Sequence, residues 1–256
     1  MKRAATPNLD RLGKIEKRFS YASWTSPSHL VFLAGLLPHS APRRTLASKV
    51  YRDEYQRWKK RLEIKNFDYL KFLPELNFAQ LLKRYKYQTH AMVSMPVLNP
   101  KTIFSCHFDR YELMPAHNQF DKMVEKIEFP KSGRNKFYFL NIGETHYPYL
   151  LPGMSAAKKI HGAHGVLRHM GDRAIQDQER YFSRKELLVL KNQQIECIEY
   201  LDSMLGKLFE KCPKNTYIIV TSDHGELFGE DGYFGHGPMI HPKVFEVPLV
   251  EGMVPR

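Results

Sequence analysis

Two short apolar runs, each followed at once by a histidine-bearing polar segment, constrain the fold of this chain more than any other feature. The first is KFYFLNIGE at 136–144, which leads into THYPY, and the second is TYIIVTS at 216–222, which leads into DHGELFGEDGYFGHG. Their length and their aromatic and β-branched residues predict buried strands. We therefore expect two core strands, each with polar chemistry at the point where it ends.

Helical patterns stand before and between these strands. Thr6 and Pro7 suit the start of a helix, and HLVFLAGL at 29–36 forms a second one. The stretch NFAQLLKRYKYQTHAMVS at 77–94 indicates a helix followed by a strand. Strands that alternate with helices predict an α/β fold, with helices on both faces of a mostly parallel sheet. In such folds the chemistry collects on loops beyond the carboxyl ends of the strands.

The longest predicted helix begins at a capping box made by Ser183 and Glu186. Its expected buried stripe consists of Ile195, Ile198, Leu201, Leu205 and Leu208. We find no repeat and no linker, so residues 1–256 are expected to form a single domain. The mixed aromatic and basic stretch at 49–73 is either a binding surface or a solvated amphipathic helix, and 151–182 is a polar connection without a clear period.

Charge and composition narrow the possible partners. The chain has 39 basic and 27 acidic residues, a formal net charge of +12, which indicates either a well-solvated basic surface or an attraction for anionic substrates or partners. It contains no recognisable nucleic-acid-binding module, so no nucleic-acid partner is expected. No run reaches the ~18 to 20 apolar residues that a transmembrane segment needs, and the start lacks the apolar core of a signal peptide. The three cysteines suggest reduced thiols and a cytoplasmic location, whereas the oligomeric state has no signal.

Asp223 and His224 are the strongest candidates for metal ligands. A carboxylate and an imidazole at the end of a strand suit Zn²⁺ or Mn²⁺, and Gly225 allows a sharp turn after them. The alternative is a strand-end turn in which Asp223 caps a following helix. The nearby Glu226, Glu230 and Asp231 are assigned no role and could simply be solvated.

Three further residues are candidates for catalysis. His146 and His236 follow the two strands and could serve as ligands, as acid or base, or as donors to an anionic substrate, although each could also be merely exposed. Thr25 stands where the helix around HLVFLAGL begins, near the positive end of the helix dipole. Its hydroxyl could act as a nucleophile if a divalent metal activated it, or it could simply be a helix cap.

Taken together, these segments resemble the alkaline phosphatase superfamily, and within it the sulfatase-like branch. The matching segments are TPNLDRL at 6–12, TSPSHLVFLAG at 25–35, FYFLNIGETHYPY at 137–149, YLDSMLGKL at 200–208 and TSDHGELFGEDGYFGHG at 221–237. The resemblance implies an α/β/α sandwich around a mixed sheet. It implies attack on a sulfate or phosphate ester through a covalent enzyme intermediate. It also implies that Thr25, Asp223 and His224 bind a divalent metal, with Thr25 as nucleophile and His146 and His236 at the transferred or leaving group.

The chain departs from the sulfatase pattern in several places. Thr25 stands where sulfatases carry the Cys or Ser that becomes formylglycine, and His29 replaces the following Arg. In these respects the chain is more similar to phosphoethanolamine or glycerolphosphate transferases, which implies a small-molecule or lipid-headgroup ester as substrate. Relatives also carry an acidic metal-ligating strand before TPNLDRL and a small C-terminal domain, both of which we expect to be missing here.

Two functions follow from this comparison. The first is a metal-dependent hydrolase or transferase of sulfate or phosphate esters that uses Thr25 as nucleophile. The second is a catalytically impaired member of the family that binds an anionic ligand or a partner. The metal could be Zn²⁺, Mn²⁺, Mg²⁺ or Ca²⁺, and the residues do not distinguish among them.

Overall fold

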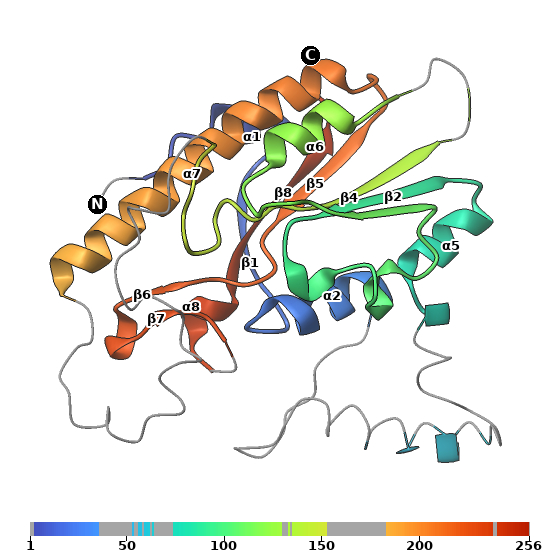
Figure 1. The fold of residues 1–256 in the computed structure, drawn as a ribbon, viewed down its shortest axis with the longest axis horizontal. Helices are drawn as coiled ribbons and strands as arrows, with labels where there is room; N and C mark the ends of the chain where they lie inside the picture. Colours follow the sequence, from blue (N-terminus) through green and yellow to red (C-terminus); the bar gives the residue numbers. More distant parts are fainter. Residues whose placement is uncertain are drawn as a thin grey trace.

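The computed structural model describes residues 3–35, 74–129, 135–152, 183–237 and 240–255, with Gly133 and a few isolated positions between 53 and 63 (Figure 1). The basic, aromatic stretch at 49–73 and the connection at 151–182 lie largely outside the described residues. The strands are β1 (Glu16–Phe19), β2 (Gln88–Val93), β3 (Arg110–Leu113), β4 (Lys136–Asn141), β5 (Tyr217–Thr221), β6 (Leu227–Phe228), β7 (Phe234–Gly235) and β8 (Glu246–Met253). The α-helices are α1 (Pro7–Leu12), α2 (Thr25–Ala34), α5 (Phe78–Arg84), α6 (Phe120–Lys126), α7 (Arg184–Lys211) and α8 (Pro242–Phe245).

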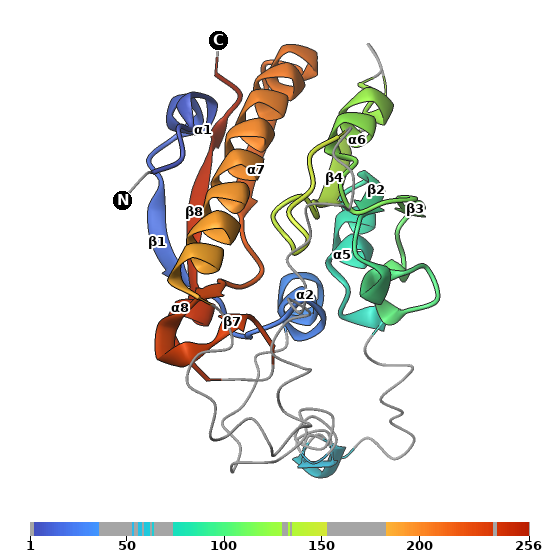
Figure 2. The ribbon, with the colours of Figure 1, turned by 60° about the vertical axis from the view of Figure 1, so that its left-hand side comes forward.

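The strands of the described ranges form one parallel sheet, one antiparallel sheet and a short hairpin. The parallel sheet has the order β3-β2-β4, the antiparallel sheet has the order β1-β8-β5, and β6 pairs with β7. Helices α1, α6 and α7 lie on one side of the strands, and α2 and α5 lie on the other (Figures 1 and 2). The predicted α/β fold with helices on both faces is therefore confirmed.

Helix α7 carries the core on its side of the sheets. The capping box of Ser183 and Glu186 is present at its start. Its buried residues include the predicted Ile195, Leu205 and Leu208, and the helix packs against α1 and α6. Burying one large aliphatic side chain contributes roughly 1.5–3 kcal/mol to the stability of the fold, so the buried face of α7 is a main source of stability on this side of the sheets. None of the helices in the described ranges is both long enough and apolar enough to cross a membrane.

A second core fills the opposite face of the parallel sheet. It is made by α2, by the end of β2 and by the turns that follow, with the buried residues Leu30, Leu33, Val93, Leu98 and Phe104. This packing fixes α2 beneath the carboxyl ends of β2 and β4. Because Leu30 and Leu33 of α2 are packed in this core, the position of the whole helix is fixed, including its first turn.

The predicted burial of the two core strands is wrong in detail. β4 and β5 form at the predicted positions, but in β4 only Asn141 is buried and the other residues are half-buried. In β5 the side chains of Tyr217 and Ile219 are 55% and 61% exposed. The reason for β5 is its place at the edge of the antiparallel sheet, where β8 is its one neighbour among the described strands.

Candidate active site

The loop after β5 holds Asp223 and His224 in fixed positions. The hydroxyl of Ser20 donates to the carbonyl of Asp223 at 2.5 Å, and the hydroxyl of Ser222 donates to the carbonyl of His224 at 2.6 Å. Oδ2 of Asp223 lies 3.5 Å from Nε2 of His224. The next element is the strand β6, so Asp223 does not cap a helix. Oδ1 of Asp223 instead accepts the backbone N–H of His224 at 3.1 Å, so the two side chains form a polar pair within the loop.

Gly225 is required for a different reason from the predicted sharp turn. Its N–H donates to the carbonyl of Val244 at 2.7 Å. A Cβ at this position would collide with the backbone carbonyl of Lys243 and would lie 2.8 Å from the carbonyl of Glu246. Close approach of the loop to the start of β8 therefore explains this glycine, and it brings the Asp223–His224 pair against the antiparallel sheet.

The hairpin β6–β7 carries His236 back toward His224. Its register pairs Leu227 with Gly235, so Glu226 and His236 lie opposite each other one position further along. The rings of His224 and His236 lie with their centroids 3.9 Å apart. His146, from the segment after β4, joins them with its ring centroid 5.1 Å from that of His236. Two of the predicted catalytic histidines thus meet one predicted metal ligand.

Each of these three rings has its Nδ1 beside an oxygen that can only accept. Nδ1 of His146 lies 2.7 Å from the carbonyl of Tyr147, and Nδ1 of His224 lies 3.0 Å from that of Gly225. In His236, Nδ1 faces the Glu226 carboxylate. The hydrogen-bond network therefore assigns a proton to Nδ1 of each ring. Nε2 of a neutral ring then keeps a lone pair for a ligand, and in His224 this atom faces Oδ2 of Asp223 at 3.5 Å.

The electrostatic surroundings separate the two candidate catalytic histidines. Burial lowers the pKa of His146, and the neighbouring positive charge of His236 lowers it further. Burial alone would also lower the pKa of His236, but the hydrogen bond and the charge of Glu226 raise it above the ordinary value. Neighbouring rings with opposite shifts suit one proton donor beside one neutral ring.

Sequence reasoning missed Glu226, which it interpreted as solvated. Its side chain is only 9% exposed, because it faces His236 across the hairpin. A signal was present in the sequence: ELFGEDGYFGH is nearly symmetric around a turn rich in glycine and acidic residues, which is typical of a hairpin. Reading that symmetry would have paired the first and last residues of this segment.

Thr25 is the first residue of α2 and is buried, while Trp24 occupies the N-cap position. Its link to the cluster runs through His29, one turn along the helix. Nδ1 of His29 donates to the carbonyl of Thr25 at 2.8 Å and lies 3.8 Å from Oδ2 of Asp223. On its other side, Nε2 of His29 accepts from the side-chain amide of Asn141 at 3.3 Å. Burial lowers the pKa of His29, which favours this neutral form.

The donor set fits a divalent cation only in part. Asp223 offers a carboxylate that is 21% exposed, and His224 offers an Nε2 whose ring is oriented through Nδ1, which is the usual arrangement of a metal-bound histidine. Within the described ranges, however, no three His, Cys, Asp or Glu side chains are placed to hold a metal ion together. These residues thus provide two donors rather than a complete site.

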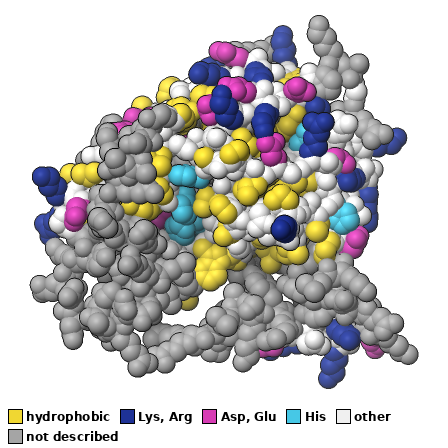
Figure 3. Space-filling model, viewed as in Figure 1, with side chains coloured by type: hydrophobic (Ala, Val, Ile, Leu, Met, Phe, Trp, Pro, Cys, Tyr) yellow, Lys and Arg dark blue, Asp and Glu magenta, His cyan; other side chains and the backbone are white. Residues whose placement is uncertain are grey.

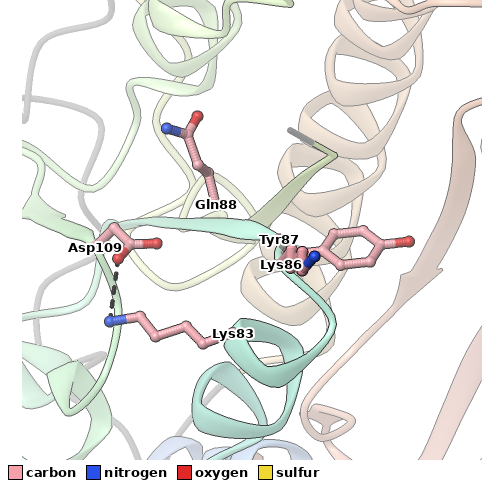
Figure 4. A pocket seen from close by; sticks show the side chains of 5 residues that line it. All are labelled: Lys83, Lys86, Tyr87, Gln88 and Asp109. Atoms are coloured by element: carbon pink, nitrogen blue, oxygen red, sulfur yellow. Dashed lines mark ion pairs between the residues drawn. The ribbon is translucent and has the colours of Figure 1, made fainter. Parts of the chain in front are cut away.

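A separate groove of about 470 Å³ lies at the opposite edge of the parallel sheet (Figure 4). Lys83, Lys86, Tyr87, Gln88 and Asp109 line it, and Nζ of Lys83 lies 3.1 Å from Oδ1 of Asp109. Because β2 begins there and runs parallel to β4, the groove is at the other end of the strands from His146. The space-filling view shows histidine side chains gathered near the middle of one face, among hydrophobic side chains (Figure 3).

Comparisons with known proteins identify the family and the fold of the chain. A family model described as Sulfatase matches residues 1–250. Among solved structures, the chain is similar to a protein in the alkaline phosphatase superfamily from Vibrio parahaemolyticus, with 18% identity and a TM-score of 0.57 over 98% of this chain and 55% of that one. No curated protein matches the chain.

Two further structures show the same fold. A 2-O GAG sulfatase has 12% identity and a TM-score of 0.56, over 97% of this chain and 58% of that one. A phosphonate monoester hydrolase from Silicibacter pomeroyi has 13% identity and a TM-score of 0.52, over 98% of this chain and 63% of that one. The chain therefore spans somewhat more than half the length of the solved structures that it matches.

Proposed function

This chain belongs to the sulfatase family, and from that premise we propose that it is a metal-dependent hydrolase or transferase of sulfate or phosphate esters. The observation that carries the proposal is the meeting of His146, His224 and His236 beside Asp223, with the buried Thr25 linked to them through His29. The substrate class is an anionic small molecule or the ester of a lipid headgroup, for which the net charge of +12 is suitable.

In this proposal Thr25 is the nucleophile. A bond forms between its Oγ and the phosphorus or sulfur of the ester, the bond to the leaving oxygen breaks, and the hydroxyl proton goes to solvent. His236 is the proton donor to the leaving oxygen, because Glu226 raises its pKa. The Nδ1–H of the neutral His146 already donates to the carbonyl of Tyr147, so its Nε2 accepts a hydrogen bond from the substrate or from the incoming water or acceptor hydroxyl. Water or an acceptor hydroxyl then displaces Thr25.

Asp223, His224 and Thr25 are the residues that would hold a divalent cation. When bound, such a cation would lower the pKa of the Thr25 hydroxyl and offset the charge of the ester. Because two strong donors are not enough for tight binding, a further ligand from outside the described residues is part of this proposal.

The second candidate function is a catalytically impaired protein that binds an anion or a partner. The incomplete donor set around Asp223 and His224 favours it. The buried, tautomer-fixed histidine cluster favours the enzyme, since binding alone does not need neighbouring rings whose pKa values are shifted in opposite directions.

Turnover of nitrophenyl phosphate and nitrophenyl sulfate, with and without added Mn²⁺ or Zn²⁺, tests the proposal. We expect metal-dependent release of nitrophenol that Thr25→Ala abolishes. Ser26→Ala, which changes the neighbouring hydroxyl in the same helical turn, should retain activity. Absence of turnover with either ester and either metal, together with specific binding of phosphate or sulfate, would favour the binding protein instead.

A further inference from the structure

Among the described residues, the carboxylate of Glu226 hydrogen-bonds one ring of the site, that of His236. Its Oε1 and Oε2 lie 3.2 and 3.1 Å from Nδ1 of His236. The side chains are 9% and 16% exposed, so little water competes for this contact. A hydrogen bond between an imidazole and a carboxylate is stronger than one between neutral groups, and it is stronger still away from water.

The hairpin leaves Glu226 and His236 little freedom to separate. The residues next to His236, Gly235 and Gly237, have φ of +97° and +149°, a region that favours glycine and sets the direction in which His236 projects. Behind the pair, Phe234 is buried and packs against Phe228 with ring centroids 5.7 Å apart. The ladder and the aromatic pair thus fix both backbones, and the carboxylate fixes the ring.

The other two rings of the cluster are held differently. Nδ1 of His146 and Nδ1 of His224 both donate to neutral backbone carbonyls. Of the three, His236 has a carboxylate on its Nδ1, supplied by a side chain that substitution can change without altering the backbone. This difference makes the arrangement open to experiment.

We propose that Glu226 is a positioning residue for His236: it accepts the Nδ1 proton, fixes the orientation of the ring and directs Nε2 toward the anionic group of the substrate. This inference rests on the proposed function for its consequence in catalysis, but the orientation itself is a property of the unliganded chain. The predicted role therefore has two readouts, one of them independent of turnover.

The first readout is the tautomer of His236, measured by ¹⁵N-imidazole NMR at alkaline pH, where the rings are neutral. His236→Gln identifies its signals. We expect the wild-type ring to carry its proton on Nδ1. Glu226→Ala should convert it to a mixture of both tautomers, whereas Glu226→Gln, whose amide oxygen still accepts, should keep the Nδ1–H form. Asp231→Asn, a carboxylate change at the exposed tip of the same hairpin, should leave the spectrum unchanged.

The second readout is turnover of the nitrophenyl ester. Loss of a partner that orients a functional histidine typically costs 10–100-fold in activity, so we expect a kcat about 10–100-fold lower in Glu226→Ala with a smaller change in KM. Glu226→Gln should recover part of the loss, and Asp231→Asn should match wild type.

The outcomes separate the two levels of the proposal. An Nε2–H ring in the wild-type protein, or unchanged His236 signals in Glu226→Ala, overturns the positioning role. If the tautomer changes as expected but the wild-type protein turns over neither ester, the positioning role stands and the proposed enzyme fails. If Glu226→Ala does not fold, the comparison of Glu226→Gln with wild type decides: His236 signals and a kcat that both equal those of wild type overturn the role. A reduced kcat supports it, whether the amide oxygen keeps the Nδ1–H form or the amide nitrogen donates to Nδ1 and shifts the ring to the Nε2–H form.

Discussion

The carboxylate of Asp202, on α7, accepts the backbone N–H groups of Asn8 and Leu9 at 3.1 and 2.8 Å and so caps the first turn of α1. The side-chain amide of Asn8 donates to the same carboxylate at 3.0 Å. Thr6 occupies the N-cap position of α1 without bonding through its side chain, so Asp202 takes over that task from a distance of 194 positions. The start of α1 and the middle of α7, which the sequence related only through a family resemblance, are therefore joined by hydrogen bonds.

Replacement of Asp202 by Ala should destabilise the fold. Asp202 is only 2% exposed, so its removal leaves the backbone N–H groups at the start of α1 without their acceptor at a place that water hardly reaches. Hydrogen bonds to a charged group contribute about 1.5–3 kcal/mol each, so we expect a loss of about 3 kcal/mol in the free energy of unfolding. Urea denaturation measures it. Asp10→Ala, at an exposed position of α1, should change stability by less than about 0.5 kcal/mol, and equal effects of the two changes would contradict the capping role.

Replacement of His29 by Ala should weaken the connection between α2 and β4. The side-chain amide of Asn141 loses its acceptor, and a buried group without a partner costs about 1–3 kcal/mol. The carbonyl of Thr25 also loses the bond that the side chain of His29 donates to it. Phe32→Ala removes a ring that packs against His29 but none of these hydrogen bonds, so it separates packing from hydrogen bonding. We expect the larger loss in urea denaturation for His29→Ala, and the reverse order would refute this account.

The stability of the fold should fall as the pH rises from about 4.5 to 7, because of Glu144. Burial raises the pKa of this fully buried carboxyl to about 7, although it accepts the N–H of Phe120 at 2.7 Å. Between these two pH values the folded state holds a proton that the unfolded state releases. The stabilisation is therefore complete below the pKa of the unfolded state, about 4.5, and is lost as the pH rises to the pKa of the folded state, about 7. This change in pKa corresponds to about 3 kcal/mol in the free energy of unfolding.

Chemical denaturation at several pH values in this range checks the prediction. Glu144→Gln, which has no proton to lose, should remove this part of the pH dependence. The exposed Glu128→Gln should keep it. A Glu144→Gln protein whose stability depends on pH as steeply as that of the wild type would show that another group is responsible.

The sequence was sufficient for the local elements of the site but not for their long-range partners. Runs of β-branched and aromatic residues predicted β4 and β5, and the polar segments after them do meet, because His146 and His236 lie side by side. The division into two sheets had no such signal: β1 reads EKRF, which is largely exposed, and it pairs with β8 from the other end of the chain. Pairing of this kind depends on tertiary packing, which periodicity does not encode.

The same limit explains what was missed around Thr25. The substitution of His29 for an expected Arg was visible, but its contacts come from Asn141 and Asp223, on two other segments. A lone histidine in an apolar helix gives no sign of which distant groups it will contact. The burial of Glu226 could have been predicted more easily, since its partner lies only ten positions away in a recognisable hairpin.

Added Mn²⁺ or Zn²⁺ should raise the temperature of unfolding through Asp223 and His224. A ligand at 100 times its Kd stabilises the folded state by about 2.7 kcal/mol, which corresponds to roughly 5–10 °C for a domain of this size. Calorimetry at increasing metal concentration measures the shift. Asp223→Ala and His224→Ala should each abolish most of this shift. Asp231→Asn, which changes a carboxylate whose side chain is 76% exposed, should retain it. Because the described residues supply two donors, the shift should appear only at high metal concentration. A shift that survives in both Asp223→Ala and His224→Ala would place the metal elsewhere.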